Sequence, residues 1–276
     1  MKKRKKVWIV LLSVVFGLFV LIAGTYFTTK LRTVNIEFRT RLSEAETRLP
    51  SGILDTVKDS AEFDYKDSVL FMDVESSISK IEKSNPYVKV TDVRRKFPNK
   101  LTVYISERIP KFRIVDGDDS DSWIILDEDF KVLEKITNAE LLNQELDEKT
   151  VEIKYFSEKI EVGEFLPMGV ERDNLNAILT GVYGRTKDYF AVRSIDYSSD
   201  TNTFYITMRM SVEKEDGTIE YQGGCVIEIE GDNDLSERSL EATCFYVGDY
   251  KDKMADISLT EKVTIISNKY GTFFKQ

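Results

Sequence analysis

The amino-acid sequence predicts an α+β protein with a single N-terminal transmembrane helix, a small α+β domain and a larger β-rich domain with flanking helices. Three patterns predict this architecture. An uncharged apolar run lies near the N-terminus, residues 33–110 combine helical spacing with alternating stretches, and strand patterns dominate after residue 194. A chain of 276 residues with 42% hydrophobic side chains is long enough to bury a real core in one large or two modest domains.

Charge is divided unevenly along the chain. Five basic residues occupy positions 2–6, and the formal net charge of the whole chain is -9. Removing those five from the 39 basic residues leaves 34 against 48 acidic ones, a charge of -14 for the rest. An acidic surface repels phosphate backbones, so we expect no nucleic-acid partner. Histidine is absent, which removes the usual general base and the commonest metal ligand, and we expect no catalytic site, metal or cofactor.

The apolar run from Val7 to Phe27 predicts one transmembrane helix, and we assign residues 7–29 to the membrane segment. Its roughly 21 residues match the ~30 Å hydrocarbon core of a bilayer. The basic stub, residues 1–6, outweighs Lys30 and Arg32, which predicts a cytoplasmic N-terminus with the later domains outside the membrane. A cleaved signal peptide is the alternative. The length of the run, and the lack of an Ala-x-Ala site after it, favour a retained anchor.

Four segments follow the membrane helix. Residues 33–38 alternate and predict a short strand, whereas the charged residues 39–48 could begin a helix. A helix is predicted for 50–59, where Pro50 stands at a favourable first position. A second helix starts after Asp73, a good N-cap residue, and ends before Asn85 and Pro86.

Residues 88–110 predict an antiparallel hairpin. Leu101, Val103 and Ile105 alternate with polar residues, which indicates a strand with one buried face. The sequence Pro98-Asn99-Lys100 supplies a turn between this strand and a looser one before it. The order strand, helix, helix, strand, strand makes a small α+β unit of roughly 75 residues, near the lower limit for an independent domain.

This unit resembles the POTRA domain of the FtsQ/DivIB family of bacterial division proteins. The family pattern joins a helix ending in an x-Pro-x-Val turn to Val-x-Arg-x-x-Pro, an alternating strand and Glu-Arg-x-Pro. The signature residues here are Pro86, Val88, Val93, Arg95, Phe97, Pro98, Leu101, Val103, Ile105, Glu107, Arg108 and Pro110. We place the POTRA-type domain at 33–110. The chain departs from the family between 39 and 66, where the passage is long, charged and contains only Gly52.

The Glu107-Arg108 pair allows two interpretations. A structural or exposed ion pair is favoured over a partner-facing edge, because exposed pairs are common and weak.

Residues 111–267 are expected to form the β-rich domain. Residues 116–122 make an acidic turn that lacks the spacing of a calcium loop, and 123–127 and 132–133 then read as paired strands. Residues 138–149 are a linker or helix, and 175–183 have helical spacing. Strand patterns and one further helix, at 234–247, complete the domain. The strands are expected at 194–197, 204–210, 219–222, 225–230, 255–259 and 262–267, with Asp216-Gly217 as a hairpin turn.

The last strand is the predicted partner-binding site. A strand near the C-terminus tends to lie at a sheet edge, where free backbone groups can accept a strand of another chain, and residues 268–276 would be a tail. The family resemblance implies the same surface, since similar proteins bind small FtsB/DivIC-type partners through their C-terminal sheet edge. The candidate residues are Asp256, Ile257, Ser258, Val263, Thr264, Ile265, Ile266 and Ser267.

The resemblance implies a non-enzymatic divisome scaffold at the division septum. Such a protein would bind FtsB/DivIC-type and FtsL-type partners outside the membrane and help couple division to septal peptidoglycan synthesis, with contact to a synthase complex. Two alternatives remain. One is a POTRA-bearing protein transport or secretion component. The other is an anchored hydrolase using Ser77 and Lys80, which match a Ser-x-x-Lys motif without its usual companion motifs.

Cys225 and Cys244 are the only cysteines. Outside the membrane they could form a disulfide, and two separate thiols are an equal expectation, since sequence does not give the distance between the two Cα atoms.

Overall fold

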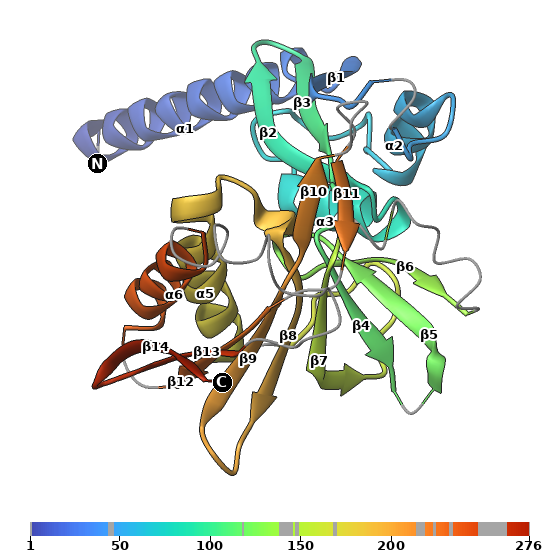
Figure 1. The fold of residues 1–276 in the computed structure, drawn as a ribbon. Coiled ribbons are helices and arrows are strands. Elements are labelled where there is room, and N and C mark those ends of the chain that lie inside the picture. The colour runs from blue at the N-terminus through green and yellow to red at the C-terminus, as the bar shows by residue number, and fades with distance from the viewer. Residues whose placement is uncertain are drawn as a thin grey trace. The chain divides into compact units, whose positions relative to one another are not determined.

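The computed structural model describes residues 2–43, 47–117, 119–137, 146, 149–167, 170–213, 219–222, 225–231, 234–247 and 264–275. The chain divides into two compact units, Met1–Arg108 and Ile109–Gln276. The boundary falls at Arg108, two residues before the end expected for the small domain. Figure 1 shows the helices and strands of both units.

One apolar helix, α1 (Lys2–Thr28), opens the first unit. Its segment Leu11–Thr28 has a mean hydropathy of 2.1 and is long and apolar enough to cross a membrane. The predicted apolar helix is therefore confirmed, although a signal sequence meets the same criteria. The basic stub is continuous with this helix, because the helical conformation already begins at Lys2. A single N-terminal helix of this kind suggests single-pass membrane anchoring.

The rest of the first unit is a three-stranded sheet with two helices. Its core contains apolar side chains from every one of these elements. The parallel pairing of β1 with β3 places β3 at the centre, in the order β1-β3-β2, and β2 forms the predicted antiparallel hairpin with β3. The elements are β1 (Thr33–Thr40), α2 (Ile53–Ser60), α3 (Val74–Ser84), β2 (Val88–Lys96) and β3 (Lys100–Glu107).

Local sequence explains how the two helices begin. The side chain of Asp73 accepts a hydrogen bond from the backbone N–H of Ser76, which caps α3 as predicted. Before α2, Gly52 adopts a left-handed conformation with φ of +81°, which glycine adopts without steric cost. The possible helix at 39–48 is not formed in the described residues. Strand β1 continues to Thr40, and residues 41–43, 47 and 48 are irregular.

The second unit is built on a nine-stranded sheet in the order β14-β13-β12-β9-β8-β7-β4-β5-β6. Strands β4, β7 and β8 pair in parallel, as do β12 and β13, and the other neighbours are antiparallel. The strands are β4 (Phe112–Asp116), β5 (Asp119–Leu126), β6 (Val132–Ile136), β7 (Val151–Glu158), β8 (Val192–Ser198), β9 (Thr203–Met208), β12 (Val226–Glu230), β13 (Thr264–Asn268) and β14 (Gly271–Lys275). A separate antiparallel pair joins β10 (Met210–Glu213) to β11 (Ile219–Gln222).

Helices α5 (Val170–Thr186) and α6 (Leu235–Phe245) pack against each other and share a core with the sheet. Figure 1 shows them side by side. Their close approach depends on Gly181, since a Cβ there would lie 2.3 Å from the backbone oxygen of Ser236. A short 3-10 helix, η2 (Tyr189–Ala191), connects α5 to β8.

The expected architecture is confirmed in both units: an apolar helix, a POTRA-like α+β unit and a larger β-rich unit with helices. Strands β4, β7, β10 and β14 were missed by the sequence analysis, and residues 119–122, expected in a turn, belong to β5. Three expectations lie mostly or wholly outside the described residues, namely the linker or helix at 138–149, the turn at 216–217 and the strand at 255–259.

Candidate partner-binding site

The predicted edge strand is not the edge of the described sheet. Strand β13 lies between β12, with which it is parallel, and β14, with which it is antiparallel. The segment 268–276, expected to be a tail, instead supplies β14, and the outermost described strand is therefore Gly271–Lys275. The signal for this hairpin was present in the sequence. Asn268 and Gly271 are turn residues, and the strand-favouring residues Thr272, Phe273 and Phe274 follow them.

The register of the hairpin assigns its side chains to two faces. Ile265 and Ser267 on β13 are buried, and Ile265 belongs to the core shared with the helices. Ile266 lies on the opposite face and pairs across the ladder with Phe273 of β14, whose side chain is 43% exposed. Since directly paired residues share one face of a sheet, Ile266 and Phe273 form an accessible apolar spot beside the outer strand.

The hairpin turn is locally stabilised. The side chain of Asn268 accepts a hydrogen bond of 2.9 Å from the backbone N–H of Tyr270. Gly271 has a φ of +126°, a region that L side chains rarely adopt. The ring of Tyr270 is 83% exposed at the tip. The turn therefore fixes the register of β14 and leaves its tip accessible.

The opposite edge of the sheet is partly occupied by the chain itself. The backbone N–H of Val132, at the start of β6, donates to the oxygen of Glu164 at 2.8 Å, and the N–H of Gly163 donates back to Val132 at 2.9 Å. Of the two edges of the nine-stranded sheet, β14 is thus the one with no such covering segment among the described residues. Six of the eight predicted partner-binding residues are not on an accessible face of this edge. Four of them lie outside the described residues, namely Asp256, Ile257, Ser258 and Val263. Ile265 and Ser267 are described but buried.

The POTRA signature residues mainly serve the fold. Arg108 is buried and its guanidinium lies 2.9 Å from a carboxylate oxygen of Glu82 on α3. The carboxylate of Glu107 is also buried and accepts hydrogen bonds from the hydroxyl of Thr47 and the backbone N–H of Arg48. Glu107 and Arg108 are therefore both buried and contact other segments of the domain, which differs from the exposed ion pair that the sequence allowed.

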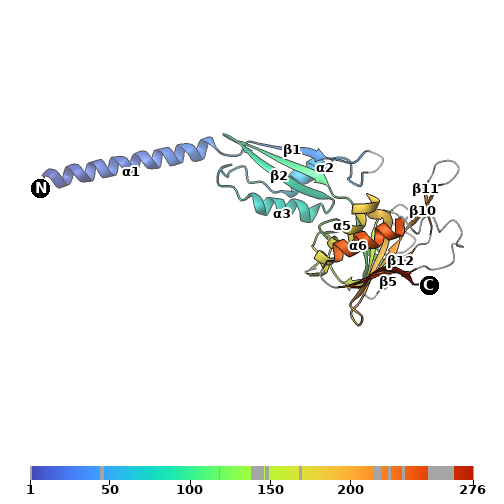
Figure 2. The same ribbon diagram turned by 60° about the vertical axis from the view of Figure 1, so that its left-hand side comes forward.

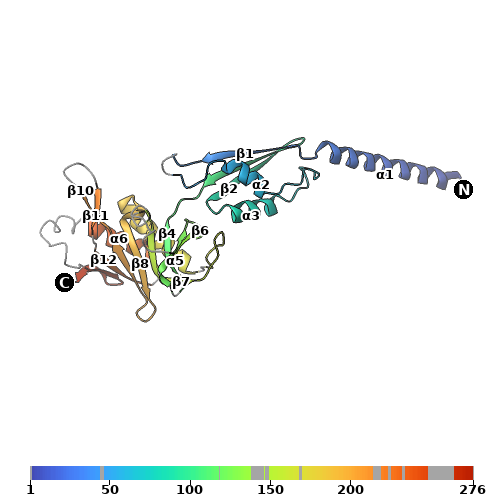
Figure 3. The same ribbon diagram turned by 90° about the vertical axis from the view of Figure 1, so that its right-hand side faces the viewer.

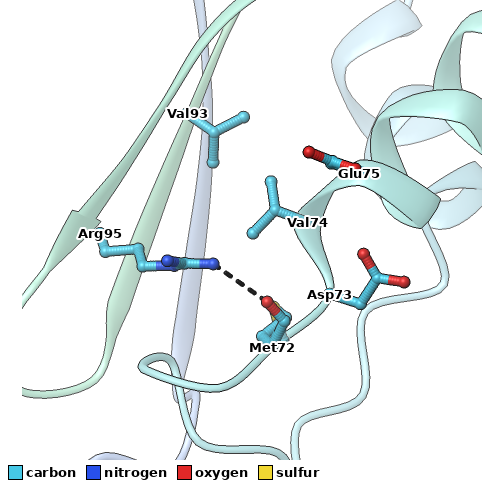
Figure 4. A pocket seen from close by; sticks show the side chains of 6 residues that line it. All are labelled: Met72, Asp73, Val74, Glu75, Val93 and Arg95. Atoms are coloured by element: carbon cyan, nitrogen blue, oxygen red, sulfur yellow. Dashed lines mark hydrogen bonds between the residues drawn. The ribbon is translucent and has the colours of Figure 1, made fainter.

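A second part of the signature lines a pocket of about 420 Å³ between β2 and the start of α3. Figure 4 shows Val93 and Arg95 from the strand facing Val74 of the helix. The guanidinium of Arg95 donates to the backbone oxygen of Met72 at 3.0 Å, which ties the end of β2 to the segment before α3. The pocket also holds Asp73 and Glu75, so it mixes both charges and defines no specific anion or cation site.

The Ser-x-x-Lys motif does not form a nucleophilic site. Ser77 is buried within α3, and the ammonium group of Lys80 is paired with the carboxylate of Glu62. This pairing lowers the pKa of Glu62, chiefly through the hydrogen bond from Lys80. A serine nucleophile needs an accessible hydroxyl next to a base, which this arrangement does not supply.

Both cysteines are free. Cys225 is buried and Cys244 is exposed, so they do not form the disulfide that the sequence left open. Burial raises the pKa of the Cys225 thiol to about 12. A neutral, buried thiol is a poor nucleophile. In the described part of the chain, no group of three or more Cys, Asp or Glu side chains is positioned to hold a metal ion.

The first unit thus has the topology of a POTRA-type domain, with two helices inserted between the first strand and a hairpin. Residues 29–108 match the family model described as POTRA domain, FtsQ-type. This match supports the predicted FtsQ/DivIB recognition, and it includes the three strands and two helices of the small domain. No curated protein matches the chain in a sequence comparison.

Proposed function

We propose that this protein is a non-enzymatic scaffold of the bacterial divisome, anchored in the cell membrane by α1. One observation carries the proposal: an FtsQ-type POTRA domain at residues 29–108 directly follows a single apolar helix. This domain supports a division-related role based on protein–protein interaction. The N-terminus is cytoplasmic, because positions 2–6 carry five basic residues, and both folded units lie outside the membrane at the septum.

The proposed partners are FtsB/DivIC-type and FtsL-type membrane proteins, bound outside the membrane. The C-terminal hairpin supports this choice of surface, because β14 has one described neighbour and the face it shares with β13 presents Ile266 and Phe273. An added strand would form backbone hydrogen bonds with β14, and alternate side chains would set its specificity. Binding would link these partners to a septal peptidoglycan synthase complex.

Localisation tests the division role. A fluorescent fusion of the full chain is expected to concentrate at the septum of dividing cells, and deletion of residues 29–108 is expected to reduce that enrichment. A uniform signal around the cell, together with a pull-down that retrieves no septal protein, would contradict the proposal.

Point variants test the binding edge. Phe273→Glu places a charge on the accessible face beside β14 and is expected to lower partner capture at least tenfold. Tyr270→Glu is the matched control, because Tyr270 is more exposed and lies in the turn rather than on the strand. If both variants capture the partner as well as the unmodified protein does, the binding surface does not include this face of β14.

A further inference from the structure

The POTRA-type domain carries exposed apolar side chains at one end. Phe71 and Phe97 are 76% and 71% exposed, and Tyr65 and Leu70 are 46% and 40% exposed. We call these four residues the apolar rim. Three of them belong to the segment before α3, whereas Phe97 lies in the β2–β3 turn. Clustered exposed aromatic side chains on a folded domain mark a surface that contacts a membrane or another molecule.

Hydrogen bonds hold the segment before α3 against the end of α1. The hydroxyl groups of Thr29 and Ser68 lie 2.6 Å apart and are buried. The backbone N–H of Leu31 donates to Asp67 at 2.9 Å. Tyr26, in the last turns of α1, donates its phenolic hydroxyl to a backbone oxygen of the same segment. The segment is therefore fixed next to the point where the chain leaves α1.

The β2–β3 turn is held at the same end. The backbone oxygen of Asn99 accepts hydrogen bonds from the N–H groups of Arg32 at 2.9 Å and Thr33 at 3.4 Å. Figures 2 and 3 show, from two directions, that the tip of the β2–β3 hairpin lies at the α1 end of the domain. Both parts of the apolar rim are thus tied to the first five residues after α1.

The charge around the rim differs from that of the rest of the chain. The segments that form this end of the domain carry five basic residues, and all of them except the half-buried Lys30 are exposed: Lys30, Arg32, Lys66, Lys96 and Lys100. The acidic residues of the segment before α3 are Glu62, Asp64, Asp67 and Asp73, of which Glu62 is paired with Lys80. The excess is positive here, although the whole chain has a formal charge of -9. Lysine next to exposed aromatic rings is typical of surfaces that contact anionic lipid headgroups.

We propose that the apolar rim inserts into the headgroup region of the bilayer that α1 crosses. The inference rests on the proposed membrane anchoring of α1. Aromatic side chains prefer this interface, and Tyr26 and Phe27 already occupy the corresponding end of the helix, where Lys30 lies 4.9 Å from the ring of Phe27. Contact at the rim would hold the POTRA-type domain in one orientation against the membrane. Without that contact the domain could rotate about the end of α1.

Lipid-borne quenching tests this contact in the full chain. The protein would be reconstituted into phosphatidylethanolamine and phosphatidylglycerol vesicles containing a lipid brominated along its acyl chain. Single fluorophores would be attached through Phe71→Cys or Phe97→Cys in a Cys244→Ser background, which keeps the buried Cys225. Each labelled protein retains the other phenylalanine of the rim and Tyr65.

Two reference sites make the result interpretable. Thr91→Cys labels an exposed position on β2, about 20 Å along the strand from Phe97 at ~3.3 Å per residue. Leu18→Cys labels the middle of the apolar helix. We expect at least twofold quenching at positions 71 and 97 as well as 18, and none at 91. Phe97→Glu should reduce the quenching at position 71 at least twofold, whereas Tyr270→Glu should leave it unchanged.

Three outcomes would overturn the proposal. Quenching at 18 with none above the level of 91 at either rim position would leave the anchor intact and refute the membrane contact. A rim label shielded from both brominated lipid and aqueous iodide would show that protein covers the rim. Absence of quenching at 18 would refute the anchor, and the rim contact would fail with it.

Discussion

Arg108 and Glu82 form a partly buried ion pair, with 2.9 Å between a guanidinium nitrogen and a carboxylate oxygen, that joins the end of β3 to α3. Each side chain also forms hydrogen bonds outside the ion pair. Arg108 also donates from Nε to the backbone oxygen of Val88, and Glu82 also accepts from the backbone N–H of Val90. The pair thereby connects the last helix of the POTRA-type domain to both strands of its hairpin.

Removing one partner of this pair should destabilise the domain strongly. Arg108→Met removes the guanidinium from the partly buried Glu82 carboxylate, and breaking a fully buried pair costs about 3–5 kcal/mol, which is the upper limit expected here. The measurement is urea unfolding followed by circular dichroism. Arg94→Met is the control, because Arg94 pairs with Asp92 on the surface, and it should change the unfolding midpoint little. Similar midpoints for the two variants would contradict the prediction.

Gly181→Ala should separate α5 from α6. The added Cβ would lie 2.3 Å from the backbone oxygen of Ser236, and backbone atoms give way less readily than a flexible side chain. Overpacking of this kind costs roughly 1–3 kcal/mol or more. In the control, Gly184→Ala, the new Cβ would meet only the side chain of Leu240 at 3.1 Å. Thermal unfolding should show a clearly lower midpoint for Gly181→Ala, and an unchanged midpoint would show that the helices can move apart freely.

The Cys225 thiol should make stability fall in alkaline solution. Burial raises its pKa from 9.0 to about 12, so the folded state holds this proton more tightly than the unfolded state does. The contribution of this protonated thiol to the free energy of unfolding is fully present below pH 9 and is lost as pH rises toward 12. The free energy of unfolding between pH 8 and pH 10.5 should therefore decline more steeply for the unmodified protein than for Cys225→Ala. Parallel declines would show that the thiol does not titrate in this range.

Thiol labelling offers an independent check. At pH 8 a maleimide reagent should modify Cys244 and leave Cys225 unmodified in the folded protein, since only Cys244 is exposed. Both should react after denaturation. Rapid labelling of Cys225 in the folded state would contradict its burial.

Proline substitutions should distinguish the inner strand from the outer one. Ile265→Pro removes a buried side chain and a backbone donor from β13, which is paired on both sides, and should cost more than about 3 kcal/mol. Thr272→Pro should cost less. The two-residue turn closes on the pair of Asn268 and Gly271, so the alternation of the ladder directs the N–H of Thr272 away from β13. Equal loss of stability in urea unfolding would argue against this register.

Sequence alone determined the apolar helix and most of the POTRA-type domain. An uncharged run of this length has one common structural outcome, and the alternating residues 101, 103 and 105 with the turn at Pro98 define a hairpin through local geometry. The Asp73 cap is equally local. The family resemblance rested on this same region, and the family match covers it.

Tertiary structure decided the sheet order, the ion pair of Arg108 with Glu82 and the position of the outer strand. The parallel pairings of β1 with β3 and of β4 with β7 join residues far apart in the chain, and no local pattern specifies such partners. From the sequence alone, Arg108 could belong to an exposed ion pair. Its partner Glu82 lies on α3, and only the folded chain brings the two side chains together. The predicted edge strand, β13, is not outermost for a similar reason. Whether a strand is outermost depends on which other segment pairs with it, and here β14 pairs with β13.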